Sequence, residues 1–294
     1  MKATGPMPDI AVAMACHNRR EITLRCLESL FNQTARVALN VFLVDDGSND
    51  GTHRAVARHF PHVSILRGDG NLYWNGAMHL ALEEAQKHPR DFFLWLNDDV
   101  ILHPHALEHL LSVHGQILKA QGIAPIVVGS FAHPKTGKPS YGGQRRISSW
   151  HPLRLGPAYH PLQPAPCHTF QGNGILIPAQ AVARIGSIDP VFSGFQEIGD
   201  TDYGFRATRA GIPIHATPDF IGLCTPNTQA AAWIRPGLSP AQRWKHFTGP
   251  KGIKARNYWI YARRHGGKLG PLFWMIHMIK GIFTLFFPRP RTTG

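Results

Sequence analysis

Residues 92–100 read FFLWLNDDV, an apolar segment that ends in two acidic residues. Phe92 to Leu96 form a continuous apolar run of the length expected for a buried strand. The run stops at Asn97, and the next two residues, Asp98 and Asp99, carry neighbouring carboxylates that could not be buried unpaired without a large free-energy cost. On its own, such an acidic pair could be an ordinary polar turn or a ligand site beyond the end of the strand.

Outward from this stretch, the first half of the chain alternates between strand and helix patterns. Strands are predicted at 10–15, 39–44, 63–66 and 92–96, with helices at 20–32 and 72–87 and another after the turn-forming DDGSNDG of 45–51. Strands separated by helices predict an α/β fold with a mostly parallel central sheet flanked by helices. Further along, we expect loops or a small irregular sheet at 134–166, a strand at 168–177, and a helix from near Gly199 to before Gly211.

Polar residues follow three of the four predicted strands. They are His17 and Asn18, then Asp45 and Asp46, then Asn97 to Asp99. In sheets of this kind ligands bind beyond the carboxyl ends of the strands, so the pattern indicates a nucleotide site. Oxygen ligands suit Mg²⁺ or Mn²⁺, which would also bind substrate phosphates. Because successive strand side chains point opposite ways, we expect one of Asp98 and Asp99 on the metal and the other on ribose or a supporting donor.

Two further acidic segments carry candidate chemistry. In VDDGSNDG, residues 44–51, a carboxylate could accept a hydrogen bond from the imide N–H of uracil or thymine, although DDGS also forms turns. In FQEIGDTDYGFRATRAG, residues 195–211, Asp200 and Asp202 fall in the first turn of a helix, where the dipole favours negative charge. Asp202 and Arg206 can pair on the helix surface, which leaves Asp200 free for proton chemistry. The two acids could also serve only to stabilise the helix.

Taken together, these segments resemble family 2 glycosyltransferases with the GT-A fold, over roughly residues 9–265. The motifs are ACHNR at 15–19, VDDGS at 44–48, GNLYWNGAMHLAL at 70–82, LNDDV at 96–100 and GDTDYGFRATRAG at 199–211. Their order and spacing both match, and rhamnosyltransferase-like members are the most similar. The resemblance implies a GT-A nucleotide-binding fold and transfer of a sugar from a nucleotide diphosphate, UDP or dTDP, to a hydroxyl of a glycan or lipid-linked acceptor.

The resemblance also implies roles for individual residues. His17 would lie against the base, and Asp46 would bind its imide. Asp98 would contact the ribose or the sugar, and Asp99 would ligate the metal that bridges the diphosphate. Asp200 would be the catalytic base. The other residues expected at the donor site are Asn18, Asn71, Trp74, Asn75 and Asn97.

The mechanism implied by the resemblance is a single displacement with inversion. Asp200 would take the proton of the acceptor hydroxyl as its oxygen attacks the anomeric carbon, which is worth roughly 10²–10⁴-fold in rate. Mn²⁺ or Mg²⁺ on Asp99 would neutralise charge on the leaving diphosphate. Two positions depart from the family's pattern. Asn97 replaces the first Asp of its D-x-D motif, and Gly199 replaces the Glu or His often found before the base.

The net charge of +13 is concentrated at the end of the chain. Twelve of the 31 Lys and Arg follow Asp219 with no acidic residue among them, which leaves 19 basic and 18 acidic residues before that point. We therefore expect a catalytic domain at 1–225, with a nucleotide-sugar half at 1–130 and an acceptor and base half at 131–225. Residues 226–294 are predicted to form a basic, amphipathic helical extension.

The apolar run from Leu272 to Phe287 is too short and too interrupted to predict a membrane-spanning helix. Basic residues interleaved with Tyr258, Trp259 and Tyr261 precede it, which is typical of a segment at an anionic lipid surface. A helix docked on the catalytic domain would share the pattern. Nucleic-acid binding would explain the charges but not the apolar run, so we expect no nucleic-acid partner. The expected location is the cytoplasm, peripherally on the inner face of the membrane.

Other classes of protein fit less well. The four cysteines show no C-x-x-C spacing, which favours free thiols in a reducing compartment. A nucleotidyltransferase that makes nucleotide sugars would need a Gly-rich phosphate loop after the first strand, where ACHNRRE has no glycine. A dehydrogenase would need G-x-G-x-x-G after a strand. A non-catalytic, membrane-bound scaffold of the same fold stays open as an alternative, although the acidic residues at 46, 99 and 200 argue against it.

Overall fold

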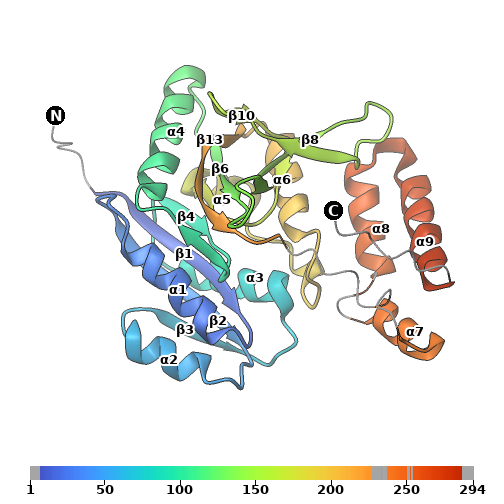
Figure 1. Cartoon of the computed structure of the whole chain (residues 1–294). Helices are drawn as coiled ribbons and strands as arrows, with labels where there is room; N and C mark the ends of the chain where they lie inside the picture. Colours follow the sequence, from blue (N-terminus) through green and yellow to red (C-terminus); the bar gives the residue numbers. More distant parts are fainter. Residues whose placement is uncertain (1–6, 227–232, 234–236, 250–251, 253, 287–294) are drawn as a thin grey trace.

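The computed structural model of the protein describes residues 7–226, 233, 237–249, 252 and 254–286. Its centre is a ten-stranded sheet with helices on both faces (Figure 1). The first half of the chain supplies β1 (Asp9–Cys16), α1 (Arg20–Phe31), β2 (Ala38–Asp46), α2 (Thr52–His59), β3 (Ser64–Gly68), α3 (Tyr73–Ala85) and β4 (Phe92–Trp95). Strand β1 pairs in parallel with both β2 and β4, and β2 pairs in parallel with β3. The predicted α/β fold with a mostly parallel central sheet is therefore confirmed.

The second half of the chain completes this sheet and adds a smaller one. Its elements are β5 (Val100–Leu102), α4 (Ala106–Gln121), β6 (Ile126–Ala132), β7 (Pro139–Tyr141), β8 (Gly143–Arg146), β9 (Leu155–Ala158), β10 (Ala165–Pro166), β11 (Thr169–Phe170), β12 (Ile175–Pro178), α5 (Ala179–Ile185), α6 (Gly199–Arg209) and β13 (Ile214–Cys224). The large sheet runs β10-β13-β6-β12-β4-β1-β2-β3, with β5 on β13 and β7 on β6. Strands β8, β9 and β11 form the small sheet.

The prediction of one strand at 168–177 is wrong. The structure divides this segment into β11, which joins the small sheet, and β12, which lies antiparallel between β4 and β6 in the large one. The break is the sequence Gln-Gly-Asn-Gly at 171–174, where Gly174 has a φ of +59° that favours glycine. A chain that changes sheets must turn, and the apolar residues on either side concealed that turn in the hydrophobic pattern.

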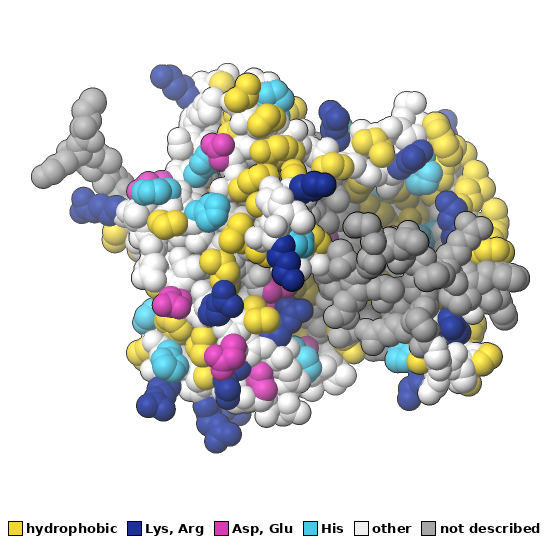
Figure 2. Space-filling view, in the orientation of Figure 1, with side chains coloured by type: hydrophobic (Ala, Val, Ile, Leu, Met, Phe, Trp, Pro, Cys, Tyr) yellow, Lys and Arg dark blue, Asp and Glu magenta, His cyan; other side chains and the backbone are white. Residues whose placement is uncertain are grey.

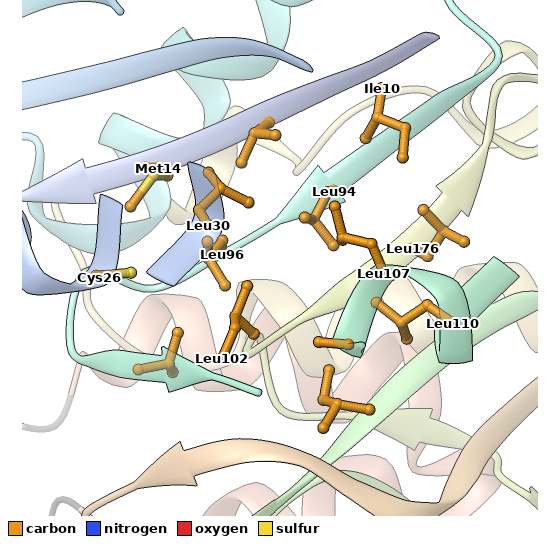
Figure 3. Packing of buried hydrophobic residues seen from close by; sticks show 14 of the residues in the cluster. Ile10, Met14, Cys26, Leu30, Leu94, Leu96, Leu102, Leu107, Leu110 and Leu176 are labelled. Atoms are coloured by element: carbon orange, nitrogen blue, oxygen red, sulfur yellow. The ribbon is translucent and has the colours of Figure 1, made fainter. Parts of the chain in front are cut away.

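The core consists of two layers, one on each face of the large sheet. Because side chains alternate along β1, Ile10, Val12 and Met14 face α1 and α4, and their cluster includes Cys26, Leu30, Leu94, Leu107 and Leu110 (Figure 3). Ala11 and Ala13 face the opposite layer, where they pack with residues of α3 and α6. Each fully buried aliphatic side chain of this kind contributes about 1.5–3 kcal/mol, so the two layers hold the strand ends in fixed positions.

The C-terminal part of the chain folds into helices beside the small sheet. They are α7 (Pro240–Thr248), α8 (Ala255–His265) and α9 (Gly270–Phe286), and α8 and α9 lie side by side (Figure 1). The loop between β8 and β9 reaches α9, where the rings of His151 and Phe273 stack with centroids 3.9 Å apart. Within the described residues, no helix is long and apolar enough to cross a membrane.

Helix α8 packs against α6, which corrects part of the expectation for its aromatic residues. Tyr261 is buried and lies against Phe205 of α6, with ring centroids 6.3 Å apart, whereas Trp259 is 37% exposed. The expectation that Tyr261 lies at a lipid surface is therefore wrong. The sequence does not show which partner covers a helix face. Several residues of the predicted basic extension lie outside the described residues, namely 227–232, 234–236, 250–251, 253 and 287–294.

Candidate active site

Asp98 and Asp99 lie in the turn that follows β4 and share one cationic partner. The Nη1 atom of Arg19, which precedes α1, lies 3.0 Å from Asp98 Oδ1 and 3.0 Å from Asp99 Oδ2. Burial raises the pKa of Asp98 to about 6, although the charge of Arg19 acts to lower it. Two carboxylate oxygens therefore converge on one positively charged atom, an arrangement that also suits two ligands of a divalent cation.

Asp98 and Asp99 would supply only part of the ligand shell of a divalent metal. Across the described part of the chain, no group of three or more His, Cys, Asp and Glu side chains is placed to hold a metal ion. Mg²⁺ and Mn²⁺ are commonly held by one or two carboxylates, with substrate phosphates and water completing the shell. The Asp98 and Asp99 pair fits a metal of that kind, and it does not form a closed metal site of its own.

Asp46, at the end of β2, binds the backbone at the start of α3. Its Oδ1 accepts from the amides of Gly70 and Leu72 at 2.8 and 3.3 Å, and its Oδ2 accepts from the amide of Tyr73 at 3.0 Å. The helix has no side-chain cap from its own N-terminal residues. Asp46 therefore caps α3 from a neighbouring strand.

His17 and Asn18 form a hydrogen-bonded group beside Asp46. His17 Nδ1 lies 2.6 Å from the backbone oxygen of Asp46, which can only accept, so Nδ1 carries the hydrogen. The other ring nitrogen, Nε2, then accepts from Asn18 Nδ2 at 3.1 Å. Asn18 also accepts from the amide of Asn49 at 2.8 Å, which ties the end of β1 to the loop after β2.

Trp74 and Asn97 meet at the same end of the sheet, whereas Asn71 and Asn75 do not join them. Trp74 Nε1 donates to Asn97 Oδ1 at 2.7 Å. Asn71 is exposed in the loop before α3. Asn75 is fully buried, and its Nδ2 donates to the backbone oxygens of Phe195 and Glu197 at 2.8 and 2.9 Å. In this structure Asn75 therefore fixes the segment that leads into α6.

The presence of a glycine at position 199 is explained by its close contact with Asn75. A Cβ atom at Gly199 would collide with the Asn75 amide oxygen. Because that amide is buried and fixed by two hydrogen bonds, it cannot move aside at low cost. The absence of a side chain immediately before Asp200 is thus a packing requirement of this chain.

Asp200 is held at the N-terminus of α6. Its Oδ2 accepts from the amide of Gly172 at 2.8 Å and its Oδ1 from the amide of Thr201 at 2.7 Å. Burial raises the pKa of Asp200, and these hydrogen bonds act to lower it. A Cβ atom at Gly172 would lie 2.5 Å from Trp74 Cζ2 and 3.4 Å from Asp200 Cβ, so the indole ring and Asp200 both lie close to this glycine.

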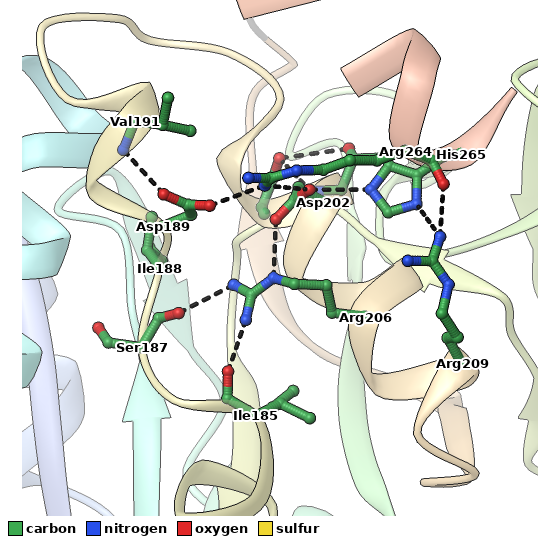
Figure 4. Close-up of polar contacts among 12 residues, drawn as sticks. Ile185, Ser187, Ile188, Asp189, Val191, Asp202, Arg206, Arg209, Arg264 and His265 are labelled. Atoms are coloured by element: carbon green, nitrogen blue, oxygen red, sulfur yellow. Dashed lines mark hydrogen bonds and ion pairs between the residues drawn. The ribbon is translucent and has the colours of Figure 1, made fainter. Parts of the chain in front are cut away.

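Asp202 lies in a buried polar cluster (Figure 4). Arg206 Nε donates to Asp202 Oδ2 at 2.8 Å, which confirms the predicted pair. The pair is not on the surface, however, because the Asp202 side chain has no exposure. Its Oδ1 accepts from Arg264 and His265 of α8, more than sixty positions away in sequence, and no local pattern could predict those partners.

Other residues at the site were not singled out by the sequence analysis. They are Arg19, Gly172, Asn173 and Cys224. Asn173 Nδ2 donates to Cys224 Sγ at 3.3 Å, and that sulfur lies 3.9 Å from Asp99 Oδ1. The available signal was a Gly-Asn-Gly sequence within an otherwise apolar segment, since isolated glycines in a strand pattern indicate a close backbone approach.

Backbone strain is also concentrated at the site. Within the described ranges, the non-glycine residues with positive φ are Asn18, Tyr73 and Ile198, at +52°, +52° and +80°. They lie after β1, at the start of α3 and at the start of α6. Such conformations cost about 1–3 kcal/mol each and persist only where the surroundings enforce them. For the β-branched Ile198 the conformation is exceptional.

Comparison with known proteins identifies the family of the chain. The model for glycosyl transferase family 2 matches residues 11–177. The chain is 26% identical over 227 residues to N-acetylglucosaminyl-diphospho-decaprenol L-rhamnosyltransferase of Mycobacterium tuberculosis, from strains CDC 1551 / Oshkosh and ATCC 25618 / H37Rv, with 71% of this chain and 72% of the relative covered.

A solved structure shares the fold. It is the mannosyltransferase PcManGT from Pyrobaculum calidifontis in complex with GDP-Man and Mn²⁺, with a TM-score of 0.53 and 17% identity. The match covers 89% of this chain and 66% of that one, so the chain spans about two thirds of its length. The residues matched by the family model include the ends of β1, β2 and β4, where the nucleotide site was predicted. The chain belongs to glycosyl transferase family 2 and has a GT-A fold.

Proposed function

We propose that the protein is an inverting glycosyltransferase that moves a sugar from UDP or dTDP to a hydroxyl of a glycan or lipid-linked acceptor. The observation that carries the proposal is the meeting of two kinds of carboxylate at one end of the sheet. Asp98 and Asp99 converge on the guanidinium of Arg19, and Asp200 is a carboxylate whose pKa is raised by burial. Trp74 connects them, since its Nε1 binds Asn97 and its ring lies beside Gly172.

The proposed reaction is one displacement at the anomeric carbon. Asp200 accepts the proton of the acceptor hydroxyl while that oxygen attacks from the side opposite the diphosphate, so the configuration is inverted without a covalent intermediate. A raised pKa makes Asp200 a stronger base than an ordinary aspartate. Asp99 would hold Mn²⁺ or Mg²⁺ beside Asp98, and this metal, when bound, supplies positive charge that neutralises the departing diphosphate.

The donor base would lie at the ends of β1 and β2. His17, hydrogen-bonded on both ring nitrogens, offers a fixed ring face for stacking. Asp46 accepts three backbone hydrogen bonds, and a carboxylate has about four acceptor positions, so one position remains for an imide N–H. Asn18 and Asn71 would border the same nucleotide.

The acceptor proposal rests on the relatives. The relative from Mycobacterium tuberculosis is named as an L-rhamnosyltransferase for N-acetylglucosaminyl-diphospho-decaprenol, and the solved neighbour holds GDP-Man with Mn²⁺. A lipid-linked diphosphate sugar is therefore the first acceptor to assay, and an activated rhamnose is the first donor.

A lipid-linked acceptor requires contact with a membrane, and we place that contact on α9. Its outward face carries apolar side chains spaced three or four residues apart, namely Leu272, Met275, Ile279, Ile282 and Phe283, each at least 41% exposed. Hydrophobic side chains line the edge of the molecule near this helix (Figure 2). Exposed basic residues, among them Arg263, Lys268 and Lys280, accompany them, and no acidic residue follows Asp219. This combination suits the interface of an anionic bilayer.

The decisive test of the proposed reaction is Asp200→Asn, which keeps the shape of the side chain and removes its proton affinity. Turnover should fall by about 100-fold or more while the affinity for the nucleotide sugar stays nearly unchanged. The matched control is Asp219→Asn at an exposed aspartate, which should behave as the original protein. Proton NMR of the product should show the inverted anomer, and EDTA should abolish turnover. Full activity of Asp200→Asn, or retention of configuration, would refute the mechanism.

A further inference from the structure

Helix α6, which carries Asp200 at its N-terminus, is held on another face by the C-terminal part of the chain. We propose that His265 and Arg264 of α8 are positioning residues for Asp200, so that α8 is a working part of the active site rather than an appended anchor. They act through Asp202, which they hold in place. The inference rests on the proposed role of Asp200 as the base.

The contacts converge on one buried carboxylate (Figure 4). Asp202 Oδ1 accepts from His265 Nε2 at 2.8 Å and from Arg264 Nη1 at 3.2 Å. Asp202 Oδ2 accepts from Arg206 Nε at 2.8 Å. Burial alone would raise the pKa of Asp202, but the hydrogen bond from His265 and the charge of Arg206 outweigh it and lower that pKa. A carboxylate with both oxygens bound in this way has little freedom to turn.

The hydrogen bonds also fix the state of His265, whose side chain has no exposure. Arg209 Nη2 lies 3.2 Å from His265 Nδ1, and because a guanidinium can only donate, Nδ1 must accept. The hydrogen of the neutral ring is then on Nε2, where it is donated to Asp202. Burial lowers the pKa of His265, which favours this neutral form. His265 is thus a directed hydrogen-bond donor, locked between α6 residues on both sides.

Because Asp200 and Asp202 lie on the same helix, the hydrogen bonds that hold Asp202 also restrain the position of Asp200. Residues two apart on a helix project about 200° apart, so α6 presents Asp202 to α8 and Asp200 to Gly172 at the end of the sheet. Rotation of α6 about its axis would have to break the bonds on both sides. Ile198, immediately before the helix, has a φ of +80°, a conformation that will relax unless it is held.

Side chains of α8 contact both α6 and the segment that precedes α6. Arg264 Nη1 also lies 2.7 Å from Asp189 Oδ2, in the loop that follows α5. The ring of Phe205 lies 5.0 Å from that of His265 and 6.3 Å from that of Tyr261, measured between centroids. The same helix therefore restrains α6 and the chain that enters it, and both restraints bear on where Asp200 lies.

Three variants of His265 in the full-length protein test the proposal. His265→Leu removes the donor to Asp202, and kcat should fall by about tenfold or more with the KM for the nucleotide sugar unchanged. His265→Gln places an amide nitrogen near the former Nε2 and should return kcat to within about threefold of the original. His265→Asn is too short to reach Asp202 and should resemble His265→Leu. His88→Leu, the same change at an exposed histidine beyond α3, is the control and should have no effect.

The readout separates positioning from simple loss of folded protein. The concentration of competent enzyme is counted by titration with the nucleotide diphosphate, and kcat is calculated per binding site. If His265 only stabilises the fold, His265→Leu will have fewer binding sites but a normal kcat per site, and the proposal fails. If His265→Leu does not fold, Arg264→Gln carries the same test, with a fall in kcat and an unchanged KM expected.

Asp200→Asn run in parallel distinguishes the two proposals. An inactive Asp200→Asn with a fully active His265→Leu would overturn the positioning role and leave the base in place. An active Asp200→Asn would overturn the base itself, whatever the His265 variants do.

Discussion

Single residues in this site are held by partners that are themselves charged or buried. Arg19 is the clearest case, because its guanidinium lies where Asp98 and Asp99 converge. A divalent cation bound by the same oxygens would have to displace it. Arg19 and the metal are therefore expected to compete, and the displaced guanidinium would be free to meet a phosphate.

Arg19→Gln should consequently bind Mn²⁺ more tightly in the absence of nucleotide. Removing one positive charge next to the carboxylates should lower the Kd by about tenfold, as a partly screened Coulomb interaction at this distance implies. The measurement is titration with Mn²⁺ followed by electron paramagnetic resonance at pH 8. Arg25→Gln, at an exposed position on α1, is the control. Weaker Mn²⁺ binding by Arg19→Gln would show that Arg19 orients the carboxylates instead.

Gly199 tests how tightly the residue before Asp200 is packed. Gly199→Ala should lower the free energy of unfolding by about 1–3 kcal/mol, because its Cβ collides with the buried Asn75 amide. Gly115→Ala is the matched control on α4, where a Cβ would meet nothing within 4 Å. That substitution should stabilise the protein by about 0.5–1 kcal/mol through helix propensity. Equal effects of the two substitutions, measured by urea unfolding, would refute the packing argument.

At the scale of elements, the position of one helix depends on a residue of a strand. Helix α3 has no cap of its own, and the Asp46 carboxylate at the end of β2 binds the amides of Gly70, Leu72 and Tyr73. The same helix carries Trp74 and Asn75, which contact Asn97 and the entry to α6. Loss of the cap should therefore affect stability and the nucleotide site together.

Asp46→Ala should lower the free energy of unfolding by about 1.5–3 kcal/mol, the range for hydrogen bonds to a buried charged group. It should also weaken nucleotide binding with or without metal. Asp46→Asn keeps an acceptor oxygen but loses the charge. Its free energy of unfolding and its nucleotide affinity should lie between those of the original protein and of Asp46→Ala. Asp69→Ala is the comparison, since exposed Asp69 binds one amide, that of Asn71, at 2.9 Å. If Asp46→Ala is as stable as the original protein, the capping role is wrong.

At the scale of the whole molecule, charge and apolar surface are distributed unevenly. The sheet and its helices before residue 220 are almost neutral, and the basic residues gather in the part that contains α7 to α9. Helix α9 cannot simply be deleted to test this, because buried Phe273 stacks on His151 in the loop between β8 and β9. Surface substitutions are the cleaner test.

The paired substitution Ile279→Glu and Phe283→Glu should release the protein from vesicles that contain anionic lipid. The two side chains are 58% and 54% exposed, so the fold should tolerate the change. Ile22→Glu is the control, at a residue 45% exposed on α1. Each basic residue near the surface adds about 1 kcal/mol, so high salt should weaken binding without abolishing the apolar part. Co-sedimentation with vesicles gives the measurement, and undiminished binding of the paired variant would exclude α9 as the contact.

The sequence by itself determined the α/β class, the parallel strands and the family, because hydrophobic periodicity and short motifs are local properties of the chain. It also predicted the i, i+4 contact of Asp202 with Arg206, since a helix sets that spacing. Partners distant in sequence were decided by the tertiary structure. Asp202 meets His265, Asn75 holds the segment before Gly199, and the apparent strand at 168–177 divides between two sheets. The physical reason is that burial depends on which surfaces meet after the chain has folded. Burial raises the pKa values of Asp98 and Asp200 and orients their neighbours.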